Sequence, residues 1–245
     1  DPDAVVAELN GLGIPGVQFS KEAMSKCGIG GTHMTVRVHG EEESEEMFHH
    51  HHEHHDYSHE HEHAHEHTHK HEDHEHAHEH SHEHTHEHGD AGHTHHHHSS
   101  LHDIEHIICD HLNLPDQVKQ DVMAVYGLIA EAESHAHGMP VSEIHFHEVG
   151  TMDAVADITA VGTMDAVAVI TAVCLLMNKI APDQVIVSPV HVGSGHVHCA
   201  HGILPVPAPA TAYILNGVPM YGGAVKGELC TPTGAALLKH FATRF

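Results

Sequence analysis

A long stretch in the first half of the chain, His49–His98, contains 26 histidines, most of them alternating with glutamate. It holds too few apolar side chains to form a hydrophobic core, so we expect a long disordered insertion. Neutral imidazole is the commonest protein ligand for divalent transition metals. The stretch is internal and interleaved with other residues, unlike a purification tag. It predicts metal binding, with nickel, zinc and copper all suitable, and leaves a solvated linker without ligands as the alternative.

The charge of the chain excludes one large class of partner. The formal net charge is −26 with every histidine counted as neutral, and there are only nine lysines and arginines. Nucleic-acid binding needs a basic surface for the phosphates. We therefore expect no nucleic-acid partner. Because imidazole titrates near pH 6.5, mild acid or bound cations would offset much of this charge.

The cysteines and the apolar runs bear on the compartment. Five cysteines are widely spaced and form no CxxC pair, a pattern that favours a reducing compartment over a disulfide framework. No apolar run reaches the roughly 20 residues that span a bilayer, and no signal sequence opens the chain. We expect a cytoplasmic protein without a membrane partner.

The chain divides by composition into three segments. Residues 1–40 predict the N-terminal part of a core domain, with a short helix over Asp3–Leu9. Strands over Val17–Lys26 and Thr32–Val38 are joined through Gly28–Gly31 as a hairpin. Residues 41–100 are the His/Glu-rich metal-binding segment. Residues 101–245 predict an α/β core domain.

Two helices are expected directly after the His/Glu-rich segment. Ser99 and Ser100 can cap a helix that runs to about His111, with Leu101, Ile104, Ile107 and Ile108 on one face. A second helix is expected from Pro115 to Gly138, because its apolar residues recur at helical spacing and Pro140 comes soon after. These residues are Val118, Val122, Val125 and Ile129.

The next region predicts a parallel βαβ unit. Glu143–Glu148 is expected to be a strand, Asp153–Lys179 a helix, and Gln184–Val190 a β-branched strand buried on both faces. Beyond it we expect a helix over Ala208–Asn216, short strands over Pro219–Tyr221 and Lys226–Cys230, and a last helix after Thr231. The predicted fold class is α/β, with a parallel βαβ core and an N-terminal hairpin.

A twelve-residue repeat lies within the predicted long helix. The segment 150–161 recurs directly as 162–173, and the copies differ only at Asp157 and Val169. Twelve additional helical residues rotate the remainder of the helix by about 120°. Each copy is apolar nearly all round, so part of this rotation can be absorbed. The repeat is a recent local duplication or an artefact of sequence assembly.

The first candidate metal site is His145-Phe-His147-Glu148. Residues two apart on a strand share a face, so His145 and His147 would point the same way. Asp153 could complete the site or orient a ligand histidine. A hydrogen-bonded pair of core histidines is an equal alternative on spacing alone.

The second candidate site comes after the predicted parallel strand, where open α/β sheets bind ligands. His198, Cys199 and His201 offer imidazole and thiol ligands for nickel or zinc. Before them, Gly193-Ser194-Gly195 would let a ligand approach the backbone closely. A glycine turn with incidental histidines is the alternative.

The third candidate is the segment Gly227–Gly234, at the start of the last helix. Thr231, Thr233 and Gly234 with the free amides of a helix N-terminus would form an anion site able to hold a phosphate. Many such caps bind nothing. No P-loop motif is present, which counts against a GTPase metallochaperone.

The longest of these motifs together resemble the LarC family of nickel-insertion proteins. The matching stretches are His145-Phe-His-Glu-Val-Gly150, Gly193-Ser-Gly195, Cys199-Ala-His-Gly202, Leu204-Pro-Val-Pro-Ala-Pro-Ala210 and Gly227-Glu-Leu-Cys-Thr-Pro-Thr-Gly-Ala-Ala-Leu-Leu238. The helix that ends in Ala130-Glu-Ala-Glu133, the hairpin and the His-rich segment are similar too, so the resemblance covers nearly the whole chain.

The resemblance implies an enzyme, a nickel chelatase of the lyase class. Its substrate would be a pyridinium bisthiocarboxylate mononucleotide, which nickel insertion turns into the pincer cofactor of lactate racemase, with CTP as a further cofactor. The His49–His98 tract would gather Ni²⁺, and His145 and His147, supported by Glu148 or Asp153, would position it. A lactate racemase apoenzyme is the implied downstream partner, and a homo-oligomer is left open.

The chain departs from the family pattern in three places. It lacks the family's opening strand and Asp-Cys-Phe-Ser-Gly type loop, it ends before the C-terminal family domain expected to bind CTP, and the repeat lies directly after the best motif. We therefore expect a chain that binds nickel with or without completing catalysis. The alternative functions are a non-catalytic nickel or zinc buffer or metallochaperone, and a structural protein with a solvated acidic tract.

Overall fold

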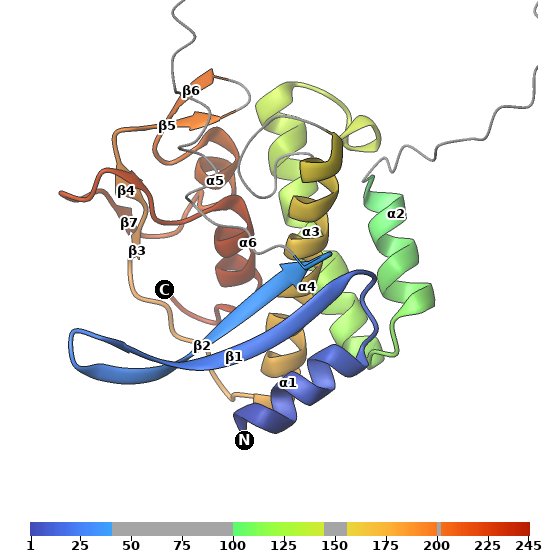
Figure 1. Cartoon of the computed structure of the whole chain (residues 1–245). Coiled ribbons are helices and arrows are strands. Elements are labelled where there is room, and N and C mark those ends of the chain that lie inside the picture. Colours follow the sequence, from blue (N-terminus) through green and yellow to red (C-terminus); the bar gives the residue numbers. More distant parts are fainter. Residues whose placement is uncertain (41–99, 145–155, 200–201) are drawn as a thin grey trace, which may run out of the picture. The chain divides into compact units, whose positions relative to one another are not determined.

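The computed structural model describes residues 1–40, 100–144, 156–199 and 202–245, with the backbone alone described at 156–163 and 198–199. These residues belong to one compact unit formed by Asp1–Glu45 and His97–Phe245. The unit mixes helices with short strands (Figure 1). Within the described residues no helix is both long and apolar enough to cross a membrane.

The N-terminal segment forms a helix and then a hairpin. Helix α1 (Pro2–Gly11) precedes the antiparallel strands β1 (Val17–Lys26) and β2 (Ile29–Val38). Cys27 and Gly28 form the turn with φ of 52° and 80°, the left-handed geometry that matches the twist of a hairpin. The predicted hairpin is confirmed, but its turn is tighter than expected and β2 begins three residues earlier.

A side chain from α1 fixes the hairpin against the helix. The amide of Asn10 donates to the carbonyl oxygen of Phe19 at 2.9 Å, and its oxygen accepts from the N–H of Phe19 at 2.8 Å. Phe19 is buried, so Asn10 satisfies backbone groups that lie next to the core. Figure 1 shows the hairpin crossing α4 (Ala156–Ile180), which both of its strands contact.

The helix after the His/Glu-rich segment begins at the predicted cap. Ser100 is the N-cap of α2 (Leu101–His106), and Ser100 and Asp103 bond each other's backbone N–H in a capping box. A π-helical segment, η3 (Ile107–His111), continues the helix to the predicted end. Ile104 and Ile108 are buried, while Leu101 and Ile107 are half-buried.

Helix α3 (Asp116–His137) is the central helix of the unit. It packs against α2, α4, α5 (Pro209–Ile214) and α6 (Pro232–Phe241). The helix begins after Pro115 and ends at Gly138, which has a φ of 65° as a left-handed C-cap. Its four predicted core residues, Val118, Val122, Val125 and Ile129, are all fully buried. Both predicted boundaries and the predicted face of this helix are therefore confirmed.

The predicted βαβ unit is not confirmed. A short 3-10 helix, η4 (Val141–Glu143), occupies the start of the first predicted strand, and His145–Glu148 lie outside the described residues. The helix is confirmed as α4 from Ala156 onward. The predicted buried strand over Gln184–Val190 is wrong, because only Val190 lies in a regular strand and Ile186 is 59% exposed.

The run 184–190 does not form the predicted strand because of the backbone with which it pairs. Val185 and Val187 bond the backbone of the chain's last residues, Thr243 and Arg244, and Ile186 makes only an isolated bridge to Arg244. In the described residues, this contact is a single bridge and not a ladder. A β-branched run becomes a regular strand only where a neighbouring strand continues beside it.

The segment 190–194 contains two short strands, and each pairs with a strand that comes later in the chain. Strand β3 (Val190–His191) pairs in parallel with β7 (Met220–Tyr221), and β4 (Gly193–Ser194) pairs antiparallel with β8 (Gly227–Glu228). Between them along the chain, β5 (His196–Cys199) and β6 (Gly202–Pro205) form a hairpin. The predicted strands near Tyr221 and Glu228 and the predicted helices α5 and α6 are thus confirmed, and a parallel pair exists at a place other than the predicted one.

Candidate functional site

Most of the predicted metal ligands lie outside the residues that the structure describes. His145, His147, Glu148, Asp153 and His201, together with the His49–His98 tract, lie outside the described residues. His198 and Cys199 lie in β5, where the backbone alone is described. In the part of the chain that the structure does describe, no three His, Cys, Asp or Glu side chains are grouped so as to hold a metal ion. The predicted ligand sets stay predictions.

The first predicted glycine of the Gly193-Ser194-Gly195 motif is explained by strand packing. Gly193 has a φ of +90°, and a Cβ atom there would lie 2.0 Å from the carbonyl oxygen of Gly227 in β8. Ser194 donates from its hydroxyl to the carbonyl oxygen of Val225 at 2.8 Å. Ser194 thus holds β4 against the loop before β8, and the absence of a side chain at Gly193 lets β8 approach closely. This structural role accounts for Gly193 without a ligand.

His191 in β3, two residues before Gly193, lies in a closely fitted setting. The ring of His191 stacks on Tyr221 with centroids 4.6 Å apart and planes 1° from parallel. The backbone of Gly223 also lies close to this ring, because a Cβ atom on Gly223 would be 2.4 Å from Nε2 of His191. Nε2 itself is buried and has no hydrogen-bond partner among the described residues. Buried polar atoms are normally paired, so this nitrogen is a candidate for a ligand contact. Sequence reasoning did not find this setting, because the stacking depends on the pairing of β3 with β7.

A carboxylate and a thiol lie on and just after β8. Burial raises the pKa of Glu228, and the nearby Ala208 backbone and Thr211 hydroxyl offset part of that rise. Burial also raises the pKa of the Cys230 thiol, and the charge of Glu228 adds to the effect. Cys230 is therefore held as a thiol rather than as the thiolate that binds metals.

The start of α6 uses most of its amides for its own cap. Thr231 is the N-cap, and its Oγ1 accepts the N–H of Gly234 at 3.2 Å. The N–H of Ala235 donates to the Thr231 carbonyl at 2.9 Å, and Pro232 has no N–H. The predicted cap is confirmed. Thr233 contributes the remaining amide of the first turn and a hydroxyl, which is a small donor set for an anion.

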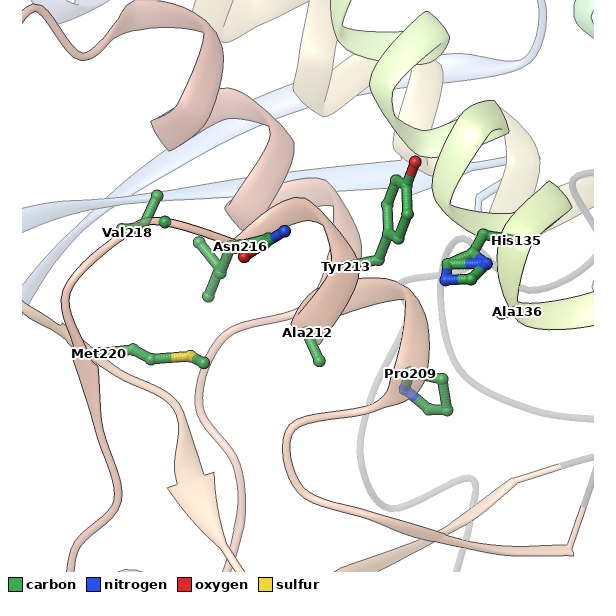
Figure 2. A pocket seen from close by; sticks show the side chains of 10 residues that line it. His135, Ala136, Pro209, Ala212, Tyr213, Asn216, Val218 and Met220 are labelled. Carbon is green, nitrogen blue, oxygen red and sulfur yellow. The ribbon is translucent and has the colours of Figure 1, made fainter.

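A hollow between the C-terminal end of α3 and α5 was not predicted. It has a volume of about 520 Å³, and Figure 2 shows His135, Tyr213, Asn216 and Met220 along it. The rings of His135 and Tyr213 meet edge to face with centroids 4.5 Å apart. The Tyr213 hydroxyl donates to Glu131 at 3.2 Å, a bond that raises the pKa of Tyr213. Only the segment Ala130–Glu133 could have indicated this place from the sequence.

Comparison with known proteins agrees with the motifs. The model of the nickel insertion protein family matches residues 1–161 and again 159–245, which together cover the chain. The chain belongs to the nickel insertion protein family. No solved structure matches it.

Three relatives illustrate the similarity. Each is called a pyridinium-3,5-bisthiocarboxylic acid mononucleotide nickel insertion protein. The protein of Desulfitobacterium hafniense is 43% identical over 148 residues, which are 60% of this chain and 34% of the relative. That of Staphylococcus saprophyticus is 43% identical over 146 residues, with the same shares. That of Clostridium kluyveri is 44% identical over 138 residues, which are 56% of this chain and 31% of the relative. The chain spans about a third of the length of these relatives.

Proposed function

We propose that this chain takes part in the insertion of nickel into pyridinium-3,5-bisthiocarboxylic acid mononucleotide, as a nickel chelatase. The observation that carries the proposal is the family match along the whole chain, with relatives named for this reaction. The product would be the nickel-pincer cofactor of lactate racemase, whose apoenzyme would receive it.

In this function the His49–His98 tract is the nickel reservoir. Its 26 imidazoles, alternating with carboxylates, suit divalent nickel and bind it more weakly per site than an ordered cluster with fixed ligands. A reservoir of this kind raises the local concentration of nickel without holding it against transfer. The net charge of −26 also attracts a cation to the chain.

The ordered ligands of the transfer are His145 and His147, with Glu148 or Asp153 in support. Sulfur atoms and one ring carbon of the mononucleotide then replace the imidazoles around Ni²⁺, and that ring carbon releases its hydrogen as a proton when the nickel–carbon bond forms. Ser194, Gly195, His198, Cys199 and His201 form a second set of candidate groups for binding substrate and metal, while Gly193 lets β4 approach β8. Support for these roles comes from residue type and spacing within the family motifs.

The proposal includes CTP as a further cofactor, but the described residues provide few hydrogen-bond donors that could bind it. The start of α6 leaves one amide and the Thr233 hydroxyl after its cap is made, too few donors for a triphosphate. We therefore derive no step of the reaction from CTP. A cytoplasmic location fits the free thiols among the residues whose side chains are described, Cys27, Cys109, Cys174 and Cys230.

The rival function is a nickel or zinc buffer without catalysis, which the size of the His tract favours. The test replaces residues 41–99 by a Gly/Ser linker of equal length, so that Ser100 still caps α2. A chelatase keeps insertion at saturating nickel and needs more nickel for half-maximal rate. A buffer loses nearly all its nickel capacity and shows no insertion in either form.

Two measurements separate these outcomes. Calorimetric titration with Ni²⁺ and Zn²⁺ gives the metal capacity of each form, and the absorbance of the mononucleotide reports its metallation. The variant with both His145 and His147 replaced by alanine should bind nickel in its tract but not transfer it. Transfer that persists in this variant contradicts the assigned ligands, and nickel binding without any transfer by the natural chain contradicts the chelatase.

A further inference from the structure

Two Glu–His pairs lie at the C-terminal end of helix α3. Glu131 with His135 and Glu133 with His137 are each at the spacing i, i+4, which brings two side chains together on one face of a helix. The same spacing lets a helix offer two side chains to one metal ion. Residues two apart are about 200° apart around the axis, so the two pairs lie on opposite sides of α3.

The first pair packs helix α5 against α3. The Tyr213 hydroxyl of α5 donates to Glu131 at 3.2 Å, and the Tyr213 ring meets that of His135 edge to face. Both members of the pair are thus in contact with the same side chain of α5. Helix packing accounts for this pair without a ligand.

The second pair joins a buried carboxylate to an imidazole at the surface. Glu133 is 8% exposed, whereas the side chain of His137 is 34% exposed. Nε2 of His137 lies 3.5 Å from Oε2 of Glu133. A charge-assisted hydrogen bond is shorter, about 2.7–2.9 Å, and His240 and Asp121 meet at such a distance, 2.9 Å. The second pair is therefore spaced more widely than a close hydrogen bond requires.

This separation is close to that of two ligands on one metal ion. Bonds of about 2.1 Å from an ion to a nitrogen and an oxygen place the two ligand atoms about 3.0–3.4 Å apart, from octahedral to tetrahedral geometry. A small rotation of the His137 side chain would bring both atoms into one coordination shell. Burial restricts the rotamers of Glu133 and so holds one ligand in place. His137 is the last residue of α3, where the negative end of the helix dipole favours a cation.

A third pair with the same spacing provides a comparison. His106 and Asp110 are also at i, i+4, with 3.7 Å between ring nitrogen and carboxylate. Their side chains are 57% and 64% exposed. Binding an ion there would require both side chains to lose rotamer freedom, which costs conformational entropy. This pair has the spacing but not the burial that fixes a ligand.

We propose that Glu133 and His137 bind Ni²⁺ at the C-terminal end of α3, through Oε2 and Nε2. The choice of nickel rests on the proposed function, since imidazole and carboxylate suit several divalent transition metals. Within the described residues no third His, Cys, Asp or Glu completes a group with them, so water fills the other positions. A shell that is mostly water stays open to incoming ligands, which suits transfer better than storage. The predicted transfer ligands begin at His145, eight residues later in the chain.

Histidine modification of the natural chain tests the site. Diethyl pyrocarbonate labels accessible imidazoles, and mass spectrometry reads each histidine separately in one sample, so nickel bound by the tract affects all of them equally. Ni²⁺ should protect His137 at a concentration about ten-fold or more below that which protects His135 or His106. Glu133→Gln keeps the size of the side chain and should remove this difference. Equal protection of the three histidines, or a difference that persists in Glu133→Gln, overturns the proposal.

Unfolding provides a second measurement that does not depend on a change at the buried Glu133. Nickel that binds the folded chain raises the urea midpoint of unfolding. This rise should be smaller in His137→Gln than in the natural chain and unchanged in His135→Gln. The tract is the same in all three proteins, so its contribution cancels in the comparison. Equal rises in all three proteins overturn the proposal.

Both measurements are made without the mononucleotide, so their outcome is separate from that of the proposed function. Nickel held by Glu133 and His137 in a chain that inserts none contradicts the chelatase alone. Nickel insertion by a chain in which His137 is never preferentially protected contradicts the proposed site alone.

Discussion

Gly193 and Gly227 approach so closely across the β4–β8 pair that a Cβ on Gly193 would lie 2.0 Å from the Gly227 carbonyl oxygen. The obstacle is backbone, so no side-chain rotation can relieve it. Gly193 also has a φ of +90°, which L side chains rarely adopt. The conformation and the contact both require glycine at this position.

Gly193→Ala should therefore destabilise the fold strongly. The positive φ costs of order 1–3 kcal/mol, and the displacement of β8 adds to it. Gly195→Ala is the matched control, because Gly195 has a similar φ of +92° and its Cβ would lie 3.5 Å from Lys226 Cδ, an ordinary contact. Urea unfolding of both variants should show the larger loss for Gly193→Ala. Equal losses would mean that the strand pair moves apart without cost.

Glu228 should make stability depend on pH in the sense opposite to an ion-paired carboxylate. Its pKa is raised by burial, so the folded state favours the protonated form. Its contribution is fully present below the ordinary glutamate pKa and is lost as the pH rises through the higher pKa of the folded state.

The variant Glu228→Gln removes this titration. As the pH rises from acid to neutral, this variant should become more stable relative to the chain with Glu228. The measurement is the difference in unfolding free energy between the two proteins at each pH. Because the histidines of the tract titrate in both proteins, their contribution cancels in that difference. A difference that is constant with pH would show that Glu228 is solvated in the folded state.

Thr231 should act through the cap of α6. Thr231→Ala removes the acceptor of the Gly234 N–H and should cost about 1 kcal/mol of stability. Thr231→Ser keeps the hydroxyl and should keep most of that stability. Thr233→Ala changes the neighbouring hydroxyl and should have little effect on unfolding.

The same variants distinguish the cap from a phosphate site. Nickel insertion per folded molecule should be unchanged in Thr231→Ala, because the hydroxyl is already bonded within the helix. A rise in the half-saturating concentration of the mononucleotide, rescued by Thr231→Ser, would assign Thr231 to substrate binding instead.

The sequence by itself determined the features that depend on near neighbours in the chain. Ser100 with Asp103, Gly138 and Thr231 before Pro232 end or begin helices at the expected residues. A cap bonds amides two or three residues away, and the apolar residues of a helix recur at a fixed spacing. A short segment of sequence is therefore enough to predict where a helix begins and which face it buries. The family motifs are local strings for the same reason.

Only the tertiary structure decided the features that depend on a distant partner. The run 184–190 has strand composition, yet it makes only an isolated bridge to Arg244, and Val190 alone of these residues lies in a regular strand. The ring of His191 is stacked on Tyr221 only because β3 pairs with β7. Burial and pairing are set by the neighbouring element, and the local sequence does not contain that neighbour.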